Sequence, residues 1–80
     1  HGTGRKLHEE PAVYNFGRPG EGLKLKKGMV LAIEPMVSVG ASAVKQLADD
    51  SFAVKDKSFS AHFEKTIIVD DNQPLILTKF

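Results

Sequence analysis

The stretch that decides the fold reads Met-Val-Leu-Ala-Ile-Glu-Pro-Met and runs from Met29 to Met36. Because side chains alternate along a strand, both faces of this segment are apolar apart from one carboxylate, that of Glu34. We therefore predict a strand in which Glu34 is substantially buried, and such a carboxylate must neutralise, find a partner or bind a metal. Pro35 lacks a backbone N–H, so the strand should fray or bulge beside Glu34. The alternative is that Glu34 turns to solvent at the end of the strand.

A second segment, from Phe59 to Val69, alternates between apolar and polar residues. As a strand it would carry Ala61, Phe63, Lys65, Ile67 and Val69 on one face, and Ser60, His62, Glu64, Thr66 and Ile68 on the other. We predict that the first face joins the core, while the second is either solvated or part of a site. A turn at Asp70–Gln73 and a last strand from Pro74 to Thr78 would complete a hairpin over residues 59–78.

The remaining segments are short and are separated by residues typical of turns. Loops or turns are expected at His8–Pro11, Asn15–Gly22, Lys27–Gly28 and Lys55–Ser58, and a short strand is expected at Phe52–Val54. Val44–Asp50 fits either a short helix or a strand with an acidic turn at Asp49 and Asp50; we favour the strand because its neighbours are extended. The predicted fold of this chain is therefore mainly antiparallel β.

The composition excludes several classes of protein. The chain has 80 residues and no cysteine, so it holds at most one domain, without disulfides, thiolate zinc sites or thiol catalysis. Its 11 basic and 10 acidic residues are interspersed, with no basic stripe for direct contact with nucleic acid or a membrane surface. No apolar run approaches the length of a membrane span and no signal-peptide pattern is present, so we expect a cytoplasmic protein. The chain opens on His1 without an initiator methionine, and we expect it to be a piece of a longer protein.

Four separated motifs, taken together, resemble those of the type I methionine aminopeptidases. They are His1-Gly2-Thr3-Gly4, His8-Glu9-Glu10-Pro11, Gly28-Met29 followed by Ile33-Glu34-Pro35-Met36, and Ser60-Ala61-His62-Phe63-Glu64. Their order and spacing agree across nearly the whole chain, as far as Thr78. The resemblance implies that residues 1–80 are the C-terminal segment of a single peptidase domain with the α/β pita-bread fold of the creatinase and aminopeptidase family.

The resemblance also implies a dinuclear metal hydrolase that removes the initiator methionine from new polypeptides. By motif match, His1 and Glu34 would bind one metal ion, and Glu64 would bridge both ions. Glu34 would also assist the nucleophilic water, and His8 would contact the substrate and stabilise the tetrahedral intermediate. This set of oxygen and nitrogen ligands accepts Mn, Fe, Co or Zn as divalent ions. The family's other ligands, two aspartates, and a further catalytic histidine lie upstream of His1, so this chain alone is expected to be inactive.

The expected partners follow from the same resemblance. Peptides and nascent chains that begin with methionine would be the substrates, and the ribosome would be an associated partner. The missing N-terminal half of the same protein would cover apolar faces that this chain otherwise exposes, and which would make it prone to association. No direct contact with nucleic acid or with a membrane is expected. Two alternatives stay open: a non-catalytic β-rich binding or interaction module derived from the same fold, and another pita-bread peptidase, such as a proline-directed one.

Overall fold

The computed structural model describes residues 1–79, which form seven short β-strands and no helix. The strands are β1 (Val30–Ile33), β2 (Met36–Ser38), β3 (Val44–Gln46), β4 (Phe52–Val54), β5 (Ser60–His62), β6 (Lys65–Ile68) and β7 (Leu75–Ile76). All strand pairs are antiparallel, so the predicted fold class of this chain is confirmed. With no helix among these residues, none of them belongs to a helix long and apolar enough to cross a membrane.

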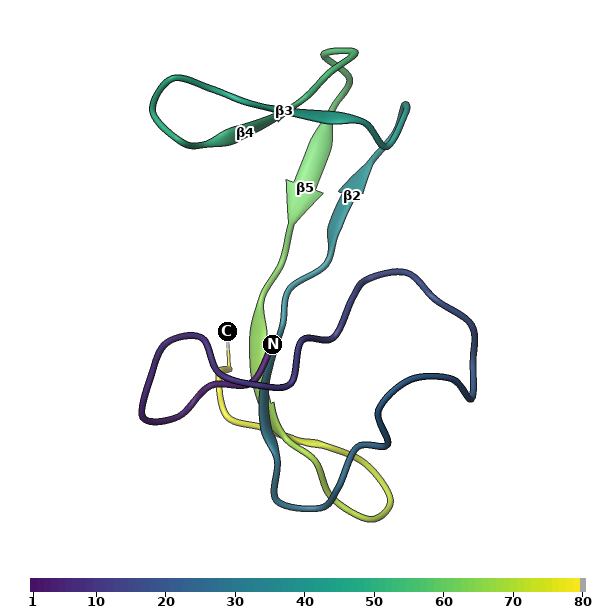
Figure 1. The fold of residues 1–80 in the computed structure, drawn as a ribbon, viewed down its shortest axis with the longest axis vertical. Helices are drawn as coiled ribbons and strands as arrows, with labels where there is room; N and C mark the ends of the chain where they lie inside the picture. Colours follow the sequence, from purple (N-terminus) through teal and green to yellow (C-terminus); the bar gives the residue numbers. More distant parts are fainter. Residues whose placement is uncertain (80) are drawn as a thin grey trace.

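A long two-stranded ribbon forms the axis of the structure (Figure 1). One side of the ribbon is β1 followed by β2, and the other side is β5 followed by β6. At one end β7 joins the free edge of β6, and at the other end the β3–β4 hairpin crosses the ribbon (Figure 1). The predicted hairpin over residues 59–78 is therefore present, with a last strand shorter than expected. Val44–Gln46 is a strand followed by a turn, as favoured over the helix.

The ribbon is interrupted beside Glu34, as we predicted from the missing N–H of Pro35. The register is the same on both sides of the gap, since Ile33 pairs with Lys65 and Met36 with His62. Pro35 therefore lies opposite Phe63, whose N–H donates to the Pro35 carbonyl oxygen at 3.3 Å. Pro35 has no N–H with which to return the second bond of this pair. The strand thus frays and does not bulge, because a bulge would shift the register.

The first three residues extend the sheet along the edge of β1 that β6 leaves free. The backbone nitrogen of His1 donates to the Ala32 oxygen at 3.1 Å, and the Ala32 N–H donates to the His1 oxygen at 2.8 Å. The predicted loop then returns, and the Glu9 N–H donates to the Gly2 oxygen at 2.8 Å. Gly2 is consequently enclosed between two backbone segments, where a Cβ would overlap the Glu10 carbonyl oxygen. Only glycine fits there, and its position fixes His1 next to the gap.

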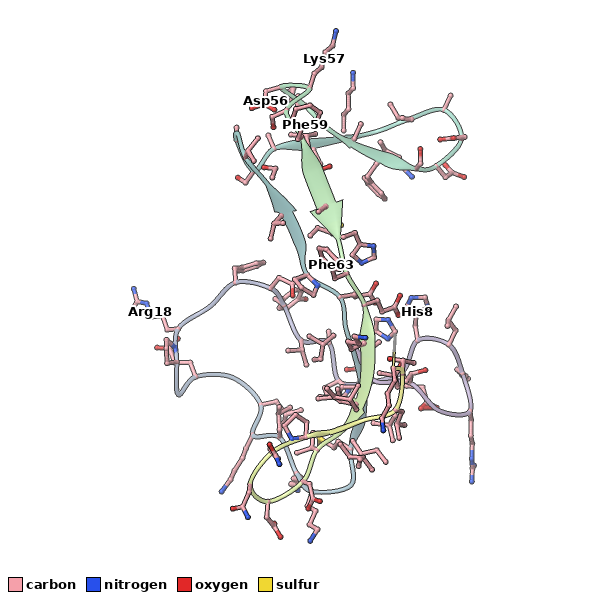
Figure 2. All side chains as sticks on the ribbon, turned by 180° about the vertical axis from the view of Figure 1, so that it is seen from behind. His8, Arg18, Asp56, Lys57, Phe59 and Phe63 are labelled. Carbon is pink, nitrogen blue, oxygen red and sulfur yellow. The ribbon has the colours of Figure 1, made fainter. Side chains whose placement is uncertain are left out.

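The core is smaller than the sequence predicted. Among the described residues Leu31 and Ala32 are the only buried hydrophobic side chains, and Gly2 beside them is buried as well. Met36 and Phe63, the latter labelled in Figure 2, are both largely exposed, at 68% and 69%. The predictions that no face of Met29–Met36 is solvated and that Phe63 joins the core are therefore wrong. The Glu34 side chain is 31% exposed, which is half-buried and not substantially buried. Alternation identifies residues that share a face, but residues 1–79 contain no second layer that covers these faces.

Candidate metal centre

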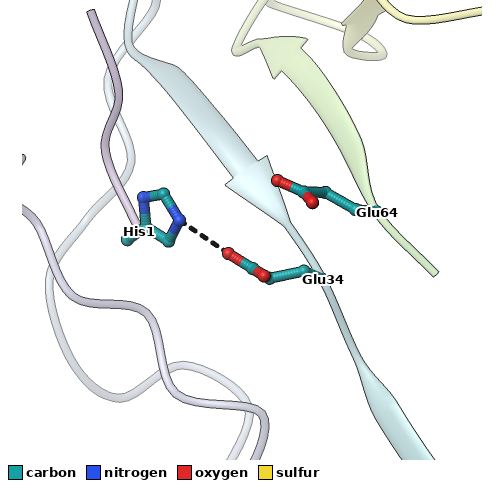
Figure 3. Close-up of side chains that lie close together, drawn as sticks. All are labelled: His1, Glu34 and Glu64. Atoms are coloured by element: carbon teal, nitrogen blue, oxygen red, sulfur yellow. Dashed lines mark ion pairs between the residues drawn. The ribbon is translucent and has the colours of Figure 1, made fainter. Parts of the chain in front are cut away.

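His1, Glu34 and Glu64 come together at the gap in the ribbon (Figure 3). Each offers one ligand atom, and these atoms all lie within 4.8 Å of one another. The three side chains come from the added edge segment, from the residue after β1 and from the residue before β6. These are the residues for which the family resemblance predicted metal binding, and the fold brings all three into one cluster.

The two carboxylates of the cluster lie directly opposite each other across the ribbon. Because the register continues through the gap, Glu34 faces Glu64. The hydrogen bond from the Val69 N–H to the Met29 oxygen identifies the odd-numbered residues as the hydrogen-bonded pairs. Glu34 and Glu64 therefore form a non-hydrogen-bonded pair, in which side chains are closest. Two like charges held this way repel each other, and a cation between them would remove the repulsion.

His1 is oriented by its own neighbour along the chain. Its Nδ1 lies 2.8 Å from the Gly2 carbonyl oxygen, and its Nε2 lies 2.6 Å from Oε1 of Glu34. The bond to Gly2 is the main reason that the pKa of His1 is raised, with smaller contributions from Glu34 and Glu64 against an opposing effect of desolvation. A backbone oxygen that holds Nδ1–H leaves Nε2 to face the carboxylates, which is the usual orientation of a metal-binding imidazole.

His8, the other predicted site residue, lies beside the cluster and outside it. Its ring centroid is 4.3 Å from that of His1, with the two rings tilted by 42°. Two hollows share His1 as a lining residue. One, of about 680 Å³, includes His8 and Glu9; the other, of about 270 Å³, includes Glu34 and Tyr14. His8 and Glu34 therefore line different hollows that have His1 in common.

The sequence did not single out His62, yet it contacts the cluster. Its Nε2 lies 3.4 Å from Oε2 of Glu34, whereas His1 contacts the other oxygen of this carboxylate, Oε1. The alternation along Phe59–Val69 correctly placed His62 on the same face as Glu64. The alternation does not give the register of the two strands. The pairing of Met36 with His62 in that register brings the imidazole diagonally next to Glu34.

The donor set fits a divalent metal ion. One imidazole nitrogen and two carboxylates combine a borderline ligand with hard oxygen ligands, a combination that suits Mn, Fe, Co and Zn. The Nδ1–H of His1 already has its backbone acceptor, as an imidazole ligand requires. The donor types of these side chains and their mutual distances of at most 4.8 Å therefore fit such an ion.

Comparisons with known proteins agree with this geometry. The family model described as metallopeptidase family M24 matches residues 1–71. The methionine aminopeptidase of Clostridium perfringens is 58% identical over 98% of this chain, and methionine aminopeptidase 1 of Bacillus subtilis is 49% identical over 99%. A crystal structure of methionine aminopeptidase from Thermotoga maritima superposes with a TM-score of 0.92 at 51% identity over the whole chain. The fold is thus that of part of a pita-bread peptidase, as the resemblance implied.

The match covers only part of the length of each relative. The chain spans 32% of the Clostridium and Bacillus proteins and 32% of the Thermotoga structure. These 80 residues therefore correspond to about one third of each of those proteins.

Proposed function

Since the chain belongs to metallopeptidase family M24, we propose that it forms part of a methionine aminopeptidase, which removes the N-terminal methionine from polypeptides. The observation that supports this most directly is the gathering of His1, Glu34 and Glu64 within 4.8 Å at a break in the ribbon. The names of the similar proteins support the same reaction.

We propose further that residues 1–80 are the C-terminal segment of a single peptidase domain. The match to about one third of each relative supports this division. The remaining metal ligands would come from the other part of the domain, so the chain alone would be inactive. Two divalent ions would complete the centre, and His1, Glu34 and Glu64 would be the residues of this chain that hold them.

The side chains of this chain divide the work as follows. When bound, divalent ions supply Lewis acidity, which lowers the pKa of a coordinated water and polarises the scissile carbonyl. Glu34 would help to hold an ion and would accept a proton of the coordinated water on its carboxylate. His1 holds its ring through the Nδ1–H bond to Gly2 and presents Nε2. His8, packed against His1 at the edge of the open hollow, can donate a hydrogen bond to the substrate.

The substrates would be peptides and nascent chains that begin with methionine. Since nascent chains are made on cytoplasmic ribosomes, we propose a cytoplasmic protein that works in association with the ribosome. Neither nucleic acid nor a membrane would be contacted directly.

The test is methionine release from a Met-Ala-Ser peptide by the full-length protein, with and without added Mn²⁺ or Co²⁺. We expect activity only with metal, and a loss of more than about 100-fold in Glu64→Gln because a ligand to the ions is removed. Glu21→Gln, a change in the exposed connector, is the matched control and should retain activity. A metal-loaded wild-type protein inert on this peptide would favour a non-catalytic module instead. Release from Xaa-Pro peptides alone would indicate a proline-directed peptidase.

A further inference from the structure

The carboxylate of Glu34 is contacted on both of its oxygens by histidines from different segments. His1 Nε2 lies 2.6 Å from Oε1, and His62 Nε2 lies 3.4 Å from Oε2. His1 belongs to the ligand cluster, whereas His62 does not. The two imidazoles therefore stand in different relations to the candidate metal centre.

The backbone gives Glu34 less support than an ordinary strand residue receives. It lies at the gap where Pro35 leaves the ladder one hydrogen bond short. A glutamate side chain also has several rotatable bonds, whose ordering costs free energy. Side-chain contacts must therefore supply much of what fixes this carboxylate.

The contact with His1 cannot fix the carboxylate of Glu34 once His1 and Glu34 bind the same ion. Nε2 of His1 would then point its lone pair at the ion and would no longer carry a proton for Oε1 of Glu34. Among the described residues, His62 is the other side chain in contact with this carboxylate, through Oε2. Its imidazole is 48% exposed against 31% for the Glu34 side chain, so this contact lies on the more exposed side of the pair.

We propose that His62 is a positioning residue for the centre: its Nε2–H donates to Oε2 of Glu34 and turns Oε1 toward His1 and Glu64. This inference rests on the proposed function, since it assigns Oε1 to a metal ion. It requires only that Nε2 carries a proton, which holds for one neutral tautomer as well as for the charged ring. A donor to the outer oxygen of a carboxylate ligand is the kind of contact that commonly sets metal affinity.

A different role for His62, as a further metal ligand, predicts a different response to substitution. A glutamine at this position keeps an N–H donor of similar reach but loses the imidazole lone pair. His62→Gln should therefore preserve a positioning role and abolish a ligand role. His62→Ala removes both.

The experiment measures Mn²⁺ affinity by calorimetry and the kinetics of Met-Ala-Ser cleavage, using the full-length protein. We expect His62→Ala to weaken Mn²⁺ binding by about tenfold and to lower kcat with little change in KM, since the substrate contacts stay in place. His62→Gln should remain within about threefold of the wild type. Ser60→Ala, two residues away on the same face of β5, is the matched control and should behave as the wild type. Wild-type behaviour of His62→Ala, or equal damage by His62→Gln, would overturn the inference.

A measurement on the metal-free protein separates this inference from the proposed function. The side-chain carboxyl ¹³C resonance of Glu34, assigned through its loss in Glu34→Gln, should move in His62→Ala and stay near its wild-type position in His62→Gln. A Glu34 resonance that does not respond to His62→Ala would overturn the inference even if methionine is released. If the wild type releases no methionine, the proposed function fails and the role at a metal centre fails with it, while the resonance still reports the contact.

Discussion

At the scale of single residues, the placement of Glu34 opposite Glu64 links stability to metal binding. Like charges directly opposite each other in an antiparallel pair are destabilising. Glu34 and Glu64 form a non-hydrogen-bonded pair, the type of cross-strand pair in which the side chains are closest. An apolar or oppositely charged residue in place of either glutamate would stabilise the ribbon. The repulsion between these two carboxylates therefore destabilises the protein without metal. A cation bound between them would turn this unfavourable contribution into a favourable one.

We predict that Glu64→Gln stabilises the metal-free full-length protein by about 0.5 kcal/mol and abolishes most of its stabilisation by Mn²⁺. The gain arises because the repulsion between the two carboxylates is removed, while His1 loses only its weaker attraction to Glu64 and keeps its ion pair with Glu34. Urea unfolding with and without Mn²⁺ measures both effects. Glu34→Gln serves as the comparison, since it removes the same repulsion but also breaks the pair with His1, and it should show no such gain. A metal-free Glu64→Gln protein less stable than the wild type would contradict the argument.

A second prediction concerns Gly2, whose neighbours are backbone atoms. A Cβ at this position would overlap the Glu10 oxygen and lie 2.8 Å from the Glu10 carbonyl carbon. Gly2→Ala should therefore destabilise the full-length protein by about 2 kcal/mol, as overpacking does, and should weaken Mn²⁺ binding because His1 moves with residue 2. Gly4→Ala is the matched control: its Cβ would meet the Glu9 side chain, which can move aside. Denaturant unfolding and calorimetry would refute the prediction if the two variants behave alike.

At the scale of elements, the base of the β3–β4 hairpin is held by one carboxylate. Asp56 accepts hydrogen bonds from the Ala41 N–H at 2.8 Å and from the Ser58 N–H at 2.9 Å. The bond from Ala41 is the largest cause that lowers the pKa of Asp56 below its ordinary value of 3.8. A carboxylate with a lowered folded-state pKa stabilises the hairpin fully above pH 3.8, and this contribution is lost as the pH falls through the lowered value.

We therefore predict that Asp56→Ala speeds amide exchange over residues 41–58 at pH 6, and that the difference from the wild type shrinks below pH 3.8. Hydrogen exchange read by mass spectrometry, corrected for the intrinsic rate at each pH, measures this difference. Asp49→Ala is the control for an acidic residue in the same hairpin, because its bonds to Ser51 stay within the turn. A difference that persists undiminished in acid would show that the charge of Asp56 plays no part.

The elements also show how far the sequence could be interpreted. The break beside Glu34 was predictable because Pro35 itself lacks the N–H. The break at Phe63 and Glu64 on the opposite strand was not predictable. It arises because the register places these two residues opposite Pro35 and Glu34. The exposure of Phe63 could not be predicted either, because an alternating pattern does not reveal whether a covering layer exists.

The candidate site divides in the same way. Alternation alone placed Glu64 and His62 on one face and made Glu34 a carboxylate in need of a partner. His1, Glu34 and Glu64 became a set only through the family resemblance, because they lie far apart in the sequence and share no local ligand spacing. The contact of His62 with Glu34 could not be predicted, because it runs diagonally across two strands and depends on their register, which the sequence pattern does not give.

At the scale of the whole molecule, the 80 residues expose more surface than a compact chain of this mass. Their accessible surface is 7079 Å², whereas a folded monomer of 8.7 kDa exposes about 4,700 Å². The radius of gyration is 14.7 Å, against about 12 Å for a compact domain of this length. The exposed surface includes large apolar side chains, since Phe16, Val39 and Phe59 are each more than four-fifths exposed.

We predict from this surplus that the isolated 80-residue chain does not fold as a stable monomer. Among residues 1–79 the buried hydrophobic side chains are those of Leu31 and Ala32, and their burial cannot offset the conformational entropy of ordering the ribbon. The isolated chain should therefore show no cooperative thermal transition, and either remain unfolded or associate through its apolar surface at micromolar concentration. Circular dichroism and sedimentation velocity test this directly, and adding the remaining part of the domain should restore a cooperative transition and metal-dependent methionine release together. A monomer that melts cooperatively on its own would contradict the argument, because it would mean that the apolar faces of this ribbon need no covering layer.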